Sequence, residues 1–517
     1  MSRRKKVEDL AHQPSQSEKG LVAGRVGLLG AVVIGVSCIA PSYTLTSGLG
    51  PTISEVGDHV PAILLLGFFP MLLVAFAYRE LNNRVPDSGT SFTWATKAFG
   101  PWIGWMGGWG LITATILVLS NLAAVAVDFF YILLAQLTGN DSFAELTRNL
   151  WVNIPTTILL LAIAAYISYR GLESTEKLQY FLVALQLFTL VLFGSMALWN
   201  AYHGGGYDFH PVEADWFNPL TIGDFSTVAA GISLSIFMFW GWDVTLTMNE
   251  ETKDPEKTPG RAATLTVLVV ITVYILTAVA IVAWAGTGDT GLGAGNPDNQ
   301  ESIFAALAGP VMGPWAILMS ISVLASSFAS LQSTMVGPAR TLLAMGFYKA
   351  LPPVFAHISP KFHTPGVATI ASAIAAGGFY TVTRIASENA LWDTITALGL
   401  MICFYYGITA FACVWFFRKE ITRSARGFIF RFLLPLIGGT MLLAMFFITA
   451  FDSIDPSYGS GSSIFGVGTV FVLGMGILLL GVVLMLFTRL KHPEFFRNET
   501  LPRVTADDED GSEVLTI

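Results

Sequence analysis

Long apolar runs separated by short polar segments dominate the chain. No Asp, Glu, Lys or Arg lies between Arg25 and Glu55 or from Asn149 to Tyr169. Five further stretches are equally uncharged: 98–127, 178–207, 262–288, 302–339 and 432–451. A membrane-spanning helix needs about 20 apolar residues. Because lipid offers no hydrogen-bond partners, the backbone of each run must pair within itself, which predicts α-helices.

The runs predict an all-α polytopic membrane protein with twelve transmembrane helices. They are expected near residues 26–54, 60–78, 101–137, 151–169, 178–200, 222–248, 262–286, 312–340, 366–384, 390–417, 427–451 and 464–488. Composition agrees, because 53% of residues are hydrophobic and 12% are charged, whereas soluble domains average about 25% charged. The three cysteines, Cys38, Cys403 and Cys413, fall within these runs, so disulfides are not expected.

The basic residues predict the orientation. With the amino terminus inside, cytoplasmic segments hold all of the 28 Lys and Arg residues except Arg148 and Arg384. This alternation follows the positive-inside rule, so both termini are expected to be cytoplasmic and the protein to lie in the cell membrane. Residues 1–25, which include Arg3 to Lys6, form a basic cytoplasmic leader. Residues 491–517, which include Asp507 to Asp510, form an acidic cytoplasmic tail.

Two predicted helices carry an interruption. Pro41 removes an amide hydrogen from the first helix, within a segment rich in Ser and Thr. Gly241 lies between Trp240 and Trp242 in the sixth. A proline can equally well mark a simple kink, but two interruptions five helices apart are typical of inverted-repeat transporters.

This spacing predicts a first five-helix repeat and a second, inverted one, in which helices 1 and 6 are broken. The repeats are expected at 26–200 and 222–417, with an extracellular loop at 201–221 between them. Helices 11 and 12 occupy 418–490. Unwound backbone at membrane depth must face a wet cavity, where its amides suit a carboxylate and its carbonyls suit a cation.

Asp243 is the most informative single residue. A carboxylate at the centre of a membrane helix costs about 2.5–3.5 kcal/mol and usually faces a cavity. It can pair with a substrate ammonium group or carry a coupling proton; alternatively it is a hydrated acid near the cytoplasmic end. Phe237, Trp240 and Trp242 can gate a cavity or hold a cation, although ordinary packing explains them equally well.

Four loops carry a family resemblance. They read YRELNNRVPDSGTSFTWATKAFGPWIGWMGGW after helix 2, YRGLESTEK after helix 4, NEETKDPEKTPGRA after helix 6 and ARTLLAMGFYKALPPVFAHISPKFHTPGVA after helix 8. In this order they resemble the amino acid–polyamine–organocation (APC) family of permeases. The resemblance implies the leucine-transporter fold, alternating access and a solute site between helices 1 and 6.

Combining the resemblance with the polar and aromatic pattern gives a set of substrate-binding candidates. They are Ile39, Ala40, Pro41, Ser42, Tyr43, Phe237, Trp240, Gly241, Trp242 and Asp243. The family usually has a Gly-Ser-Gly-like stretch where this chain has Ala40-Pro41-Ser42, which supplies fewer free amides for an α-carboxylate.

The coupling ion stays open between a proton and sodium. Many proton-coupled relatives carry a lysine fifteen residues after the loop glycine, where this chain has Gln186, which cannot titrate. For sodium, the hydroxyls of Ser326 and Ser327 can join the carbonyls of Val36 and Ile39; alternatively these hydroxyls bond their own backbone. For a proton, Asp243 is the candidate carrier.

The sequence therefore predicts a secondary transporter for an amino acid or polyamine-like amine, working by ion-coupled symport or exchange. A channel and a nutrient sensor on the same scaffold are the alternatives. Metalloprotease, hydrolase and phosphate-loop motifs are all missing from the sequence, so an enzyme is not expected. Neither a cofactor nor a nucleic-acid partner is expected, and nothing indicates the oligomeric state.

Overall fold

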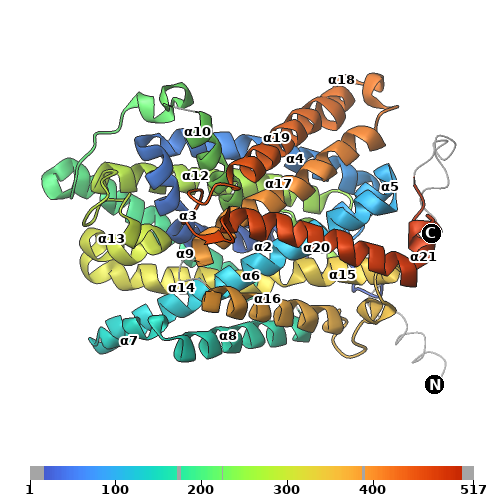
Figure 1. Cartoon of the computed structure of the whole chain (residues 1–517), viewed down its shortest axis with the longest axis horizontal. Coiled ribbons are helices and arrows are strands. Elements are labelled where there is room, and N and C mark those ends of the chain that lie inside the picture. Colours follow the sequence, from blue (N-terminus) through green and yellow to red (C-terminus); the bar gives the residue numbers. More distant parts are fainter. Residues whose placement is uncertain (1–16, 172–175, 224, 387–389, 504–517) are drawn as a thin grey trace, which may run out of the picture.

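The computed structural model describes residues 17–171, 176–223, 225–386 and 390–503. The basic cluster Arg3 to Lys6 and the acidic cluster Asp507 to Asp510 lie outside these ranges. Helices dominate the fold, and most of the long ones run side by side along one direction (Figure 1).

The described residues of the first half form eight α-helices: α2 (Leu28–Ile39), α3 (Pro41–Val56), α4 (Val60–Arg84), α5 (Ser91–Phe99), α6 (Pro101–Thr138), α7 (Ser142–Glu145), α8 (Leu150–Arg170) and α9 (Glu176–Asn200). The second half contains α10 (Phe225–Met238), α11 (Val244–Thr247), α12 (Thr258–Ala285), α13 (Ile303–Met312), α14 (Ala316–Thr334), α15 (Val336–Phe347), α16 (Gly366–Ala386) and α17 (Ala390–Phe416). The last part contains α18 (Ala425–Gly427), α19 (Leu434–Asp452), a short antiparallel pair β1 (Ser463–Ile464) and β2 (Val467–Gly468), α20 (Thr469–Lys491) and α21 (Pro493–Phe496).

Ten helical segments of the described chain are long and apolar enough to cross a membrane. The protein is therefore a mostly helical, multi-pass membrane protein. The helix predicted near 101–137 is α6, a single helix of 38 residues. It lies at the centre of the bundle, where α5, α14 and α17 pack against it. All three cysteines are buried and free.

Arg340 shows where a charge was misleading as a helix boundary. The eighth helix, predicted near 312–340, ends at this arginine, but α15 continues to Phe347. Arg340 donates to both carboxylate oxygens of Glu251, at 2.8 and 3.0 Å, and the two side chains are only 4% and 5% exposed. Because the pair neutralises the charge, the helix runs on without exposing an arginine.

The bundle has two distinct ends. Figure 1 shows α7 and α13 at one end, and α5 and α21 at the other. Two segments that precede and follow the helices, residues 17–26 and 493–503, pack at the second end against α5 and the end of α15.

Candidate substrate site

The first helical run is interrupted at Ala40. This residue adopts left-handed backbone angles, φ 55° and ψ 65°, so α2 ends at Ile39 and α3 begins at Pro41. Pro41 is the cause, because it has no amide hydrogen to continue the ladder of α2. The interruption leaves helix-end groups that other side chains satisfy: the Cys38 carbonyl accepts from Ser330 at 3.1 Å.

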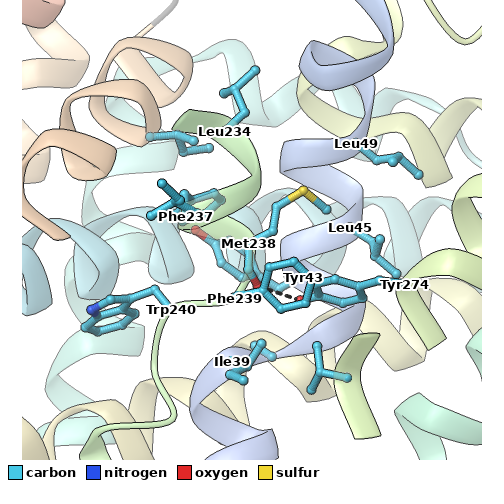
Figure 2. Packing of buried hydrophobic residues seen from close by; sticks show 14 of the residues in the cluster. Ile39, Tyr43, Leu45, Leu49, Leu234, Phe237, Met238, Phe239, Trp240 and Tyr274 are labelled. Atoms are coloured by element: carbon cyan, nitrogen blue, oxygen red, sulfur yellow. Dashed lines mark hydrogen bonds between the residues drawn. The ribbon is translucent and has the colours of Figure 1, made fainter. Parts of the chain in front are cut away.

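The second interruption follows α10. That helix ends at Met238, residues 239–243 form turns, and α11 begins only at Val244. Gly241 lies in the middle with φ 114°, a conformation that side chains disfavour. The carbonyl of Met238 accepts a hydrogen bond from the Tyr274 hydroxyl at 2.9 Å, drawn as a dashed line in Figure 2.

The two interruptions touch each other. A Cβ atom placed on Gly241 would lie 2.9 Å from the carbonyl carbon of Cys38 and 3.0 Å from the amide nitrogen of Ile39. Figure 2 shows Tyr43 of α3 facing Phe237 and Met238 of α10, whereas Trp240 points away from them. The structure thus brings the predicted residues of both segments to one place in the bundle.

Asp243 lies beside this junction in an aromatic enclosure. Its Oδ2 accepts a hydrogen bond from the Tyr405 hydroxyl at 3.0 Å, and the same hydroxyl accepts from Trp240 Nε1 at 2.6 Å. Its Oδ1 is fully buried and lacks a hydrogen bond of normal geometry. The rings of Tyr78 and Tyr406 lie 5.0 Å from that of the neighbouring Trp242.

No basic side chain of the described chain forms an ion pair with Asp243. The residue is 2% exposed, and burying an uncompensated carboxylate costs several kcal/mol, about 3 or more. The arrangement therefore offers one carboxylate oxygen, beside a group of aromatic rings, to a positively charged group.

The sequence reading missed Tyr78, Tyr405 and Tyr406. They come from α4 and α17, and only the tertiary fold brings them to Asp243. The adjacent pair of tyrosines inside the uncharged stretch of α17 was the one available signal.

A stripe of serines on α14 faces the first interruption. Ser322 Oγ lies 2.8 Å from Ser42 Oγ, and Ser326 Oγ accepts from the Tyr43 amide at 3.4 Å. Ser326 also donates to Oε1 of Gln186 at 2.5 Å, and Gln186 is fully buried. The side chain at the position of the family's lysine therefore does contact the interruption, through one serine.

The carbonyl and hydroxyl candidates for sodium differ in their contacts. The carbonyl of Val36 accepts from the Ala40 amide at 2.9 Å, and that of Ile39 accepts from Thr44 Oγ1 at 2.5 Å. Ser327 Oγ is buried without a hydrogen-bond partner. Ser326 bonds Gln186 and Tyr43 rather than its own helix, contrary to the backbone-bonded alternative. No group of three or more His, Cys, Asp or Glu side chains that could hold a metal ion occurs among the described residues.

The site is closed to solvent, but a cavity lies one helical turn away. Tyr43, Phe237 and Asp243 are 2%, 3% and 2% exposed. Leu234, one turn before Phe237 on α10, lines a cavity of about 450 Å³. The cavity walls include three carboxylates and three aromatic rings: Glu55, Asp452, Asp455, Trp392, Phe451 and Tyr458.

Comparisons with known proteins point in one direction. Residues 26–482 match the family described as Amino acid permease. The chain is 24% identical to the low-affinity putrescine importer PlaP of Escherichia coli, over 81% of this chain and 87% of that protein. It is 26% identical to the branched-chain amino acid permease BcaP of Lactococcus lactis, over 43% of this chain and 46% of that protein. The crystal structure of MhsT in complex with L-phenylalanine superposes with a TM-score of 0.56 at 15% identity, covering 81% of this chain and 98% of that one. At that identity the likeness shows the fold alone.

Proposed function

The chain belongs to the amino acid permease family, and we propose that it carries an amine-bearing solute, an amino acid or a polyamine, by alternating access. One observation carries this proposal. Asp243 is buried beside both interruptions with one oxygen unbonded and no basic partner among the described residues. An ammonium group of the substrate supplies the missing positive charge.

The aromatic enclosure supports a cationic substrate. Trp242 beside Asp243 packs against Tyr78 and Tyr406 with ring centroids 5.0 Å apart, and aromatic rings attract an ammonium group by about 2 kcal/mol when it is desolvated. The Tyr405 hydroxyl orients the carboxylate. A relative that imports putrescine is consistent with this chemistry.

A carboxylate on the substrate has a second anchor in the proposal. The first turn of α3 has amides with no acceptor in the helix, and the Tyr43 amide points to Ser326. This helix start is a site for anions. An amino acid would then bind with its carboxylate at Ser42 and Tyr43 and its charged amine toward Asp243.

We propose twelve membrane spans in a five-plus-five inverted repeat with helices 1 and 6 broken. The segment Leu28–Arg84 contains two spans, α2–α3 and α4, separated at Gly57–His59. The shorter apolar helix α10 with α11 supplies another, which raises the ten segments to twelve. The repeats are 26–200 and 222–417, joined by an extracellular loop at 201–221 and followed by helices 11 and 12 within 418–490.

The alternation of basic residues supports a cytoplasmic location for both termini, residues 1–25 and 491–517.

Coupling to sodium would use Ser326 and Ser327 with the carbonyls of Val36 and Ile39. Coupling to a proton would use Asp243. Gln186 excludes a proton carrier at the family's lysine position.

Proteoliposome uptake tests the proposal. Purified protein would be offered labelled putrescine, arginine, leucine and glutamate, with sodium and proton gradients imposed separately. We expect saturable uptake and counterflow for putrescine or arginine and none for glutamate. Uptake of glutamate alone contradicts a cation-binding Asp243, and single-channel currents without saturation contradict a carrier.

A further inference from the structure

Two segments that flank the long helices, the second of which contains α21, lie at the same end of the molecule, near α5 (Figure 1). We call residues 17–26 the entry segment and residues 493–503 the strap. The entry segment leads into α2, which forms half of the substrate site. The strap follows α20. Neither has a role in the site described above.

The entry segment is anchored by a buried charge cluster, which we call the latch. Lys19 Nζ lies 2.7 Å from Asp87 Oδ2 and 2.6 Å from Glu250 Oε1. The three side chains are 4%, 9% and 10% exposed. Asp87 belongs to the loop between α4 and α5, and Glu250 follows α11, so Lys19 joins the two halves of the protein.

The charges of the latch stabilise one another. Burial alone raises the pKa of Asp87, but the Lys19 ammonium outweighs it, so the pKa of this carboxyl lies below its usual value. Burial alone lowers the pKa of Lys19, yet Asp87 and Glu250 raise it above its usual value. Lys19 and Asp87 are therefore held in the charged state, and separating them would leave a buried charge without its partner.

The entry segment is also tied by its backbone to the segment after α11. The amides of Arg25 and Val26 donate to the Glu251 carbonyl at 2.8 and 3.1 Å, and the Lys253 amide donates to the Val26 carbonyl at 2.8 Å. Since α2 ends at the first interruption and α11 begins at the second, these contacts hold both helices in the closed arrangement.

The strap reaches the latch through Tyr348. The Tyr348 hydroxyl donates to Asp87 Oδ2 at 2.6 Å, while its backbone carbonyl accepts from Thr500 Oγ1 at 2.6 Å. On the same face, Phe92 of α5 lies between two rings, with centroids 5.4 Å from Phe495 and 6.2 Å from Tyr348. Phe495 is fully buried.

We propose that the strap and the latch form one closing device, with Tyr348 as the joint between them. The docked strap holds Tyr348 against Asp87 and so keeps Lys19 between its two carboxylates. When the strap leaves, the latch loses a hydrogen bond, and α2 and α11 separate from α5 and α15. This inference rests on the proposed alternating access, in which the substrate site must open toward this face.

Cys38 is a built-in reporter of that opening. It is buried in a cluster with Val244 of α11 and Val336 of α15, the surfaces that the latch holds together. In full-length protein carrying Cys403→Ala and Cys413→Ala, Cys38 is the one remaining thiol. Its rate of alkylation by N-ethylmaleimide in detergent, without substrate, therefore measures how often the device opens.

The test compares Thr500→Val and Tyr348→Phe with Thr488→Val. The first two remove one hydrogen bond each from the joint, whereas the Thr488 hydroxyl bonds only Leu484 in its own helix. Such a bond is worth about 0.5–1.5 kcal/mol, so we expect Cys38 to be alkylated about two- to tenfold faster in Thr500→Val and Tyr348→Phe than in the parent protein. In Thr488→Val the alkylation rate should equal that of the parent protein. Lys19→Met is expected to give the largest increase.

Each outcome bears on the proposal directly. Faster alkylation in Lys19→Met together with a parental rate in Thr500→Val and Tyr348→Phe means that the strap does not control the latch. Parental rates in all three variants mean that the cluster is no gate at all. Size-exclusion profiles separate a gating effect from unfolding. Since no substrate is used, a wrong assignment of the transported solute leaves this result unaffected.

Discussion

The backbone of Gly241 lies against the backbone of Cys38, so closely that a Cβ atom on residue 241 would be 2.9 Å from the Cys38 carbonyl carbon. The two residues are far apart in sequence, yet each belongs to an interruption of an apolar helix. Their contact requires that residue 241 has no side chain. It also requires a φ of 114°, which glycine adopts without strain. The junction of the two interruptions thus depends on backbone packing before any side chain takes part.

Gly241→Ala is expected to disrupt this junction. The added methyl group meets backbone atoms that cannot rotate away, and the unfavourable φ adds a cost of about 1–3 kcal/mol. Uptake should fall to background, and the melting temperature in detergent should drop. Gly378→Ala is the matched control, because a Cβ there has nothing within 4 Å. Normal uptake by Gly241→Ala would argue against the contact.

Asp243→Asn should abolish uptake of cationic solutes. The substitution keeps the shape and the Tyr405 hydrogen bond but removes the charge that balances an ammonium group. Thermal stability should stay equal or rise, because an uncompensated buried carboxylate disappears. Uptake and melting temperature would be measured on the same preparation. Transport of putrescine or arginine at the parental rate would remove Asp243 from the mechanism.

Tyr405→Phe separates orientation of the carboxylate from its charge. The hydroxyl links Trp240 Nε1 to Asp243 Oδ2, and a hydrogen bond to a charged group is worth about 1.5–3 kcal/mol. We expect KM for the cationic substrate to rise about 10- to 100-fold. Tyr131→Phe serves as the control, since its hydroxyl contacts Thr156 away from the site. Equal KM values for both variants would contradict an orienting role.

Ser326→Ala tests the sodium hypothesis. Its hydroxyl bridges Gln186 and the Tyr43 amide beside the first interruption. If sodium couples transport here, replacing sodium by choline should slow uptake by the parent protein, and the variant should lose that dependence. The control is Ser195→Ala, whose hydroxyl bonds the Val191 carbonyl of its own helix. Equal uptake by the parent in sodium and in choline would exclude this coupling.

The latch should be insensitive to pH over the physiological range. Asp87, with a lowered pKa, contributes stability above the unfolded value of about 4 and loses it only as the pH falls through its lower folded pKa. Lys19, with a raised pKa, contributes fully below about 10.4 and loses it only as the pH rises further. Lys19→Met strands two buried carboxylates, at about 3–5 kcal/mol. The resulting difference in melting temperature should be largest near pH 9 and shrink toward pH 5, because burial without Lys19 raises the pKa of Asp87 and protonation then relieves the stranded charge; a difference that grows toward pH 5 would contradict the charge assignment.

Part of the candidate site could be predicted from the sequence, because the effects of some residue types depend only on their immediate neighbours in the chain. Pro41 weakens the helix locally, because it lacks an amide hydrogen, and Asp243 is conspicuous in any uncharged run. Pro51 and Pro70 lie inside helices that continue, so a proline by itself did not fix the interruption. The charge-free stretches likewise defined the long helices, such as α6. Arg340 was misleading because its neutralising partner Glu251 belongs to another segment.

What the amino-acid order determined by itself is therefore the long apolar helices, the places where two of them are interrupted and one buried acid. These features depend on backbone hydrogen bonding and burial within a few residues of chain. The tertiary structure alone decided that Tyr405 meets Asp243, that Ser326 links Gln186 to Tyr43 and that Lys19 lies between Asp87 and Glu250. Such partners are chosen by how distant helices pack, and side-chain pairing across a bundle leaves no periodic mark along the chain.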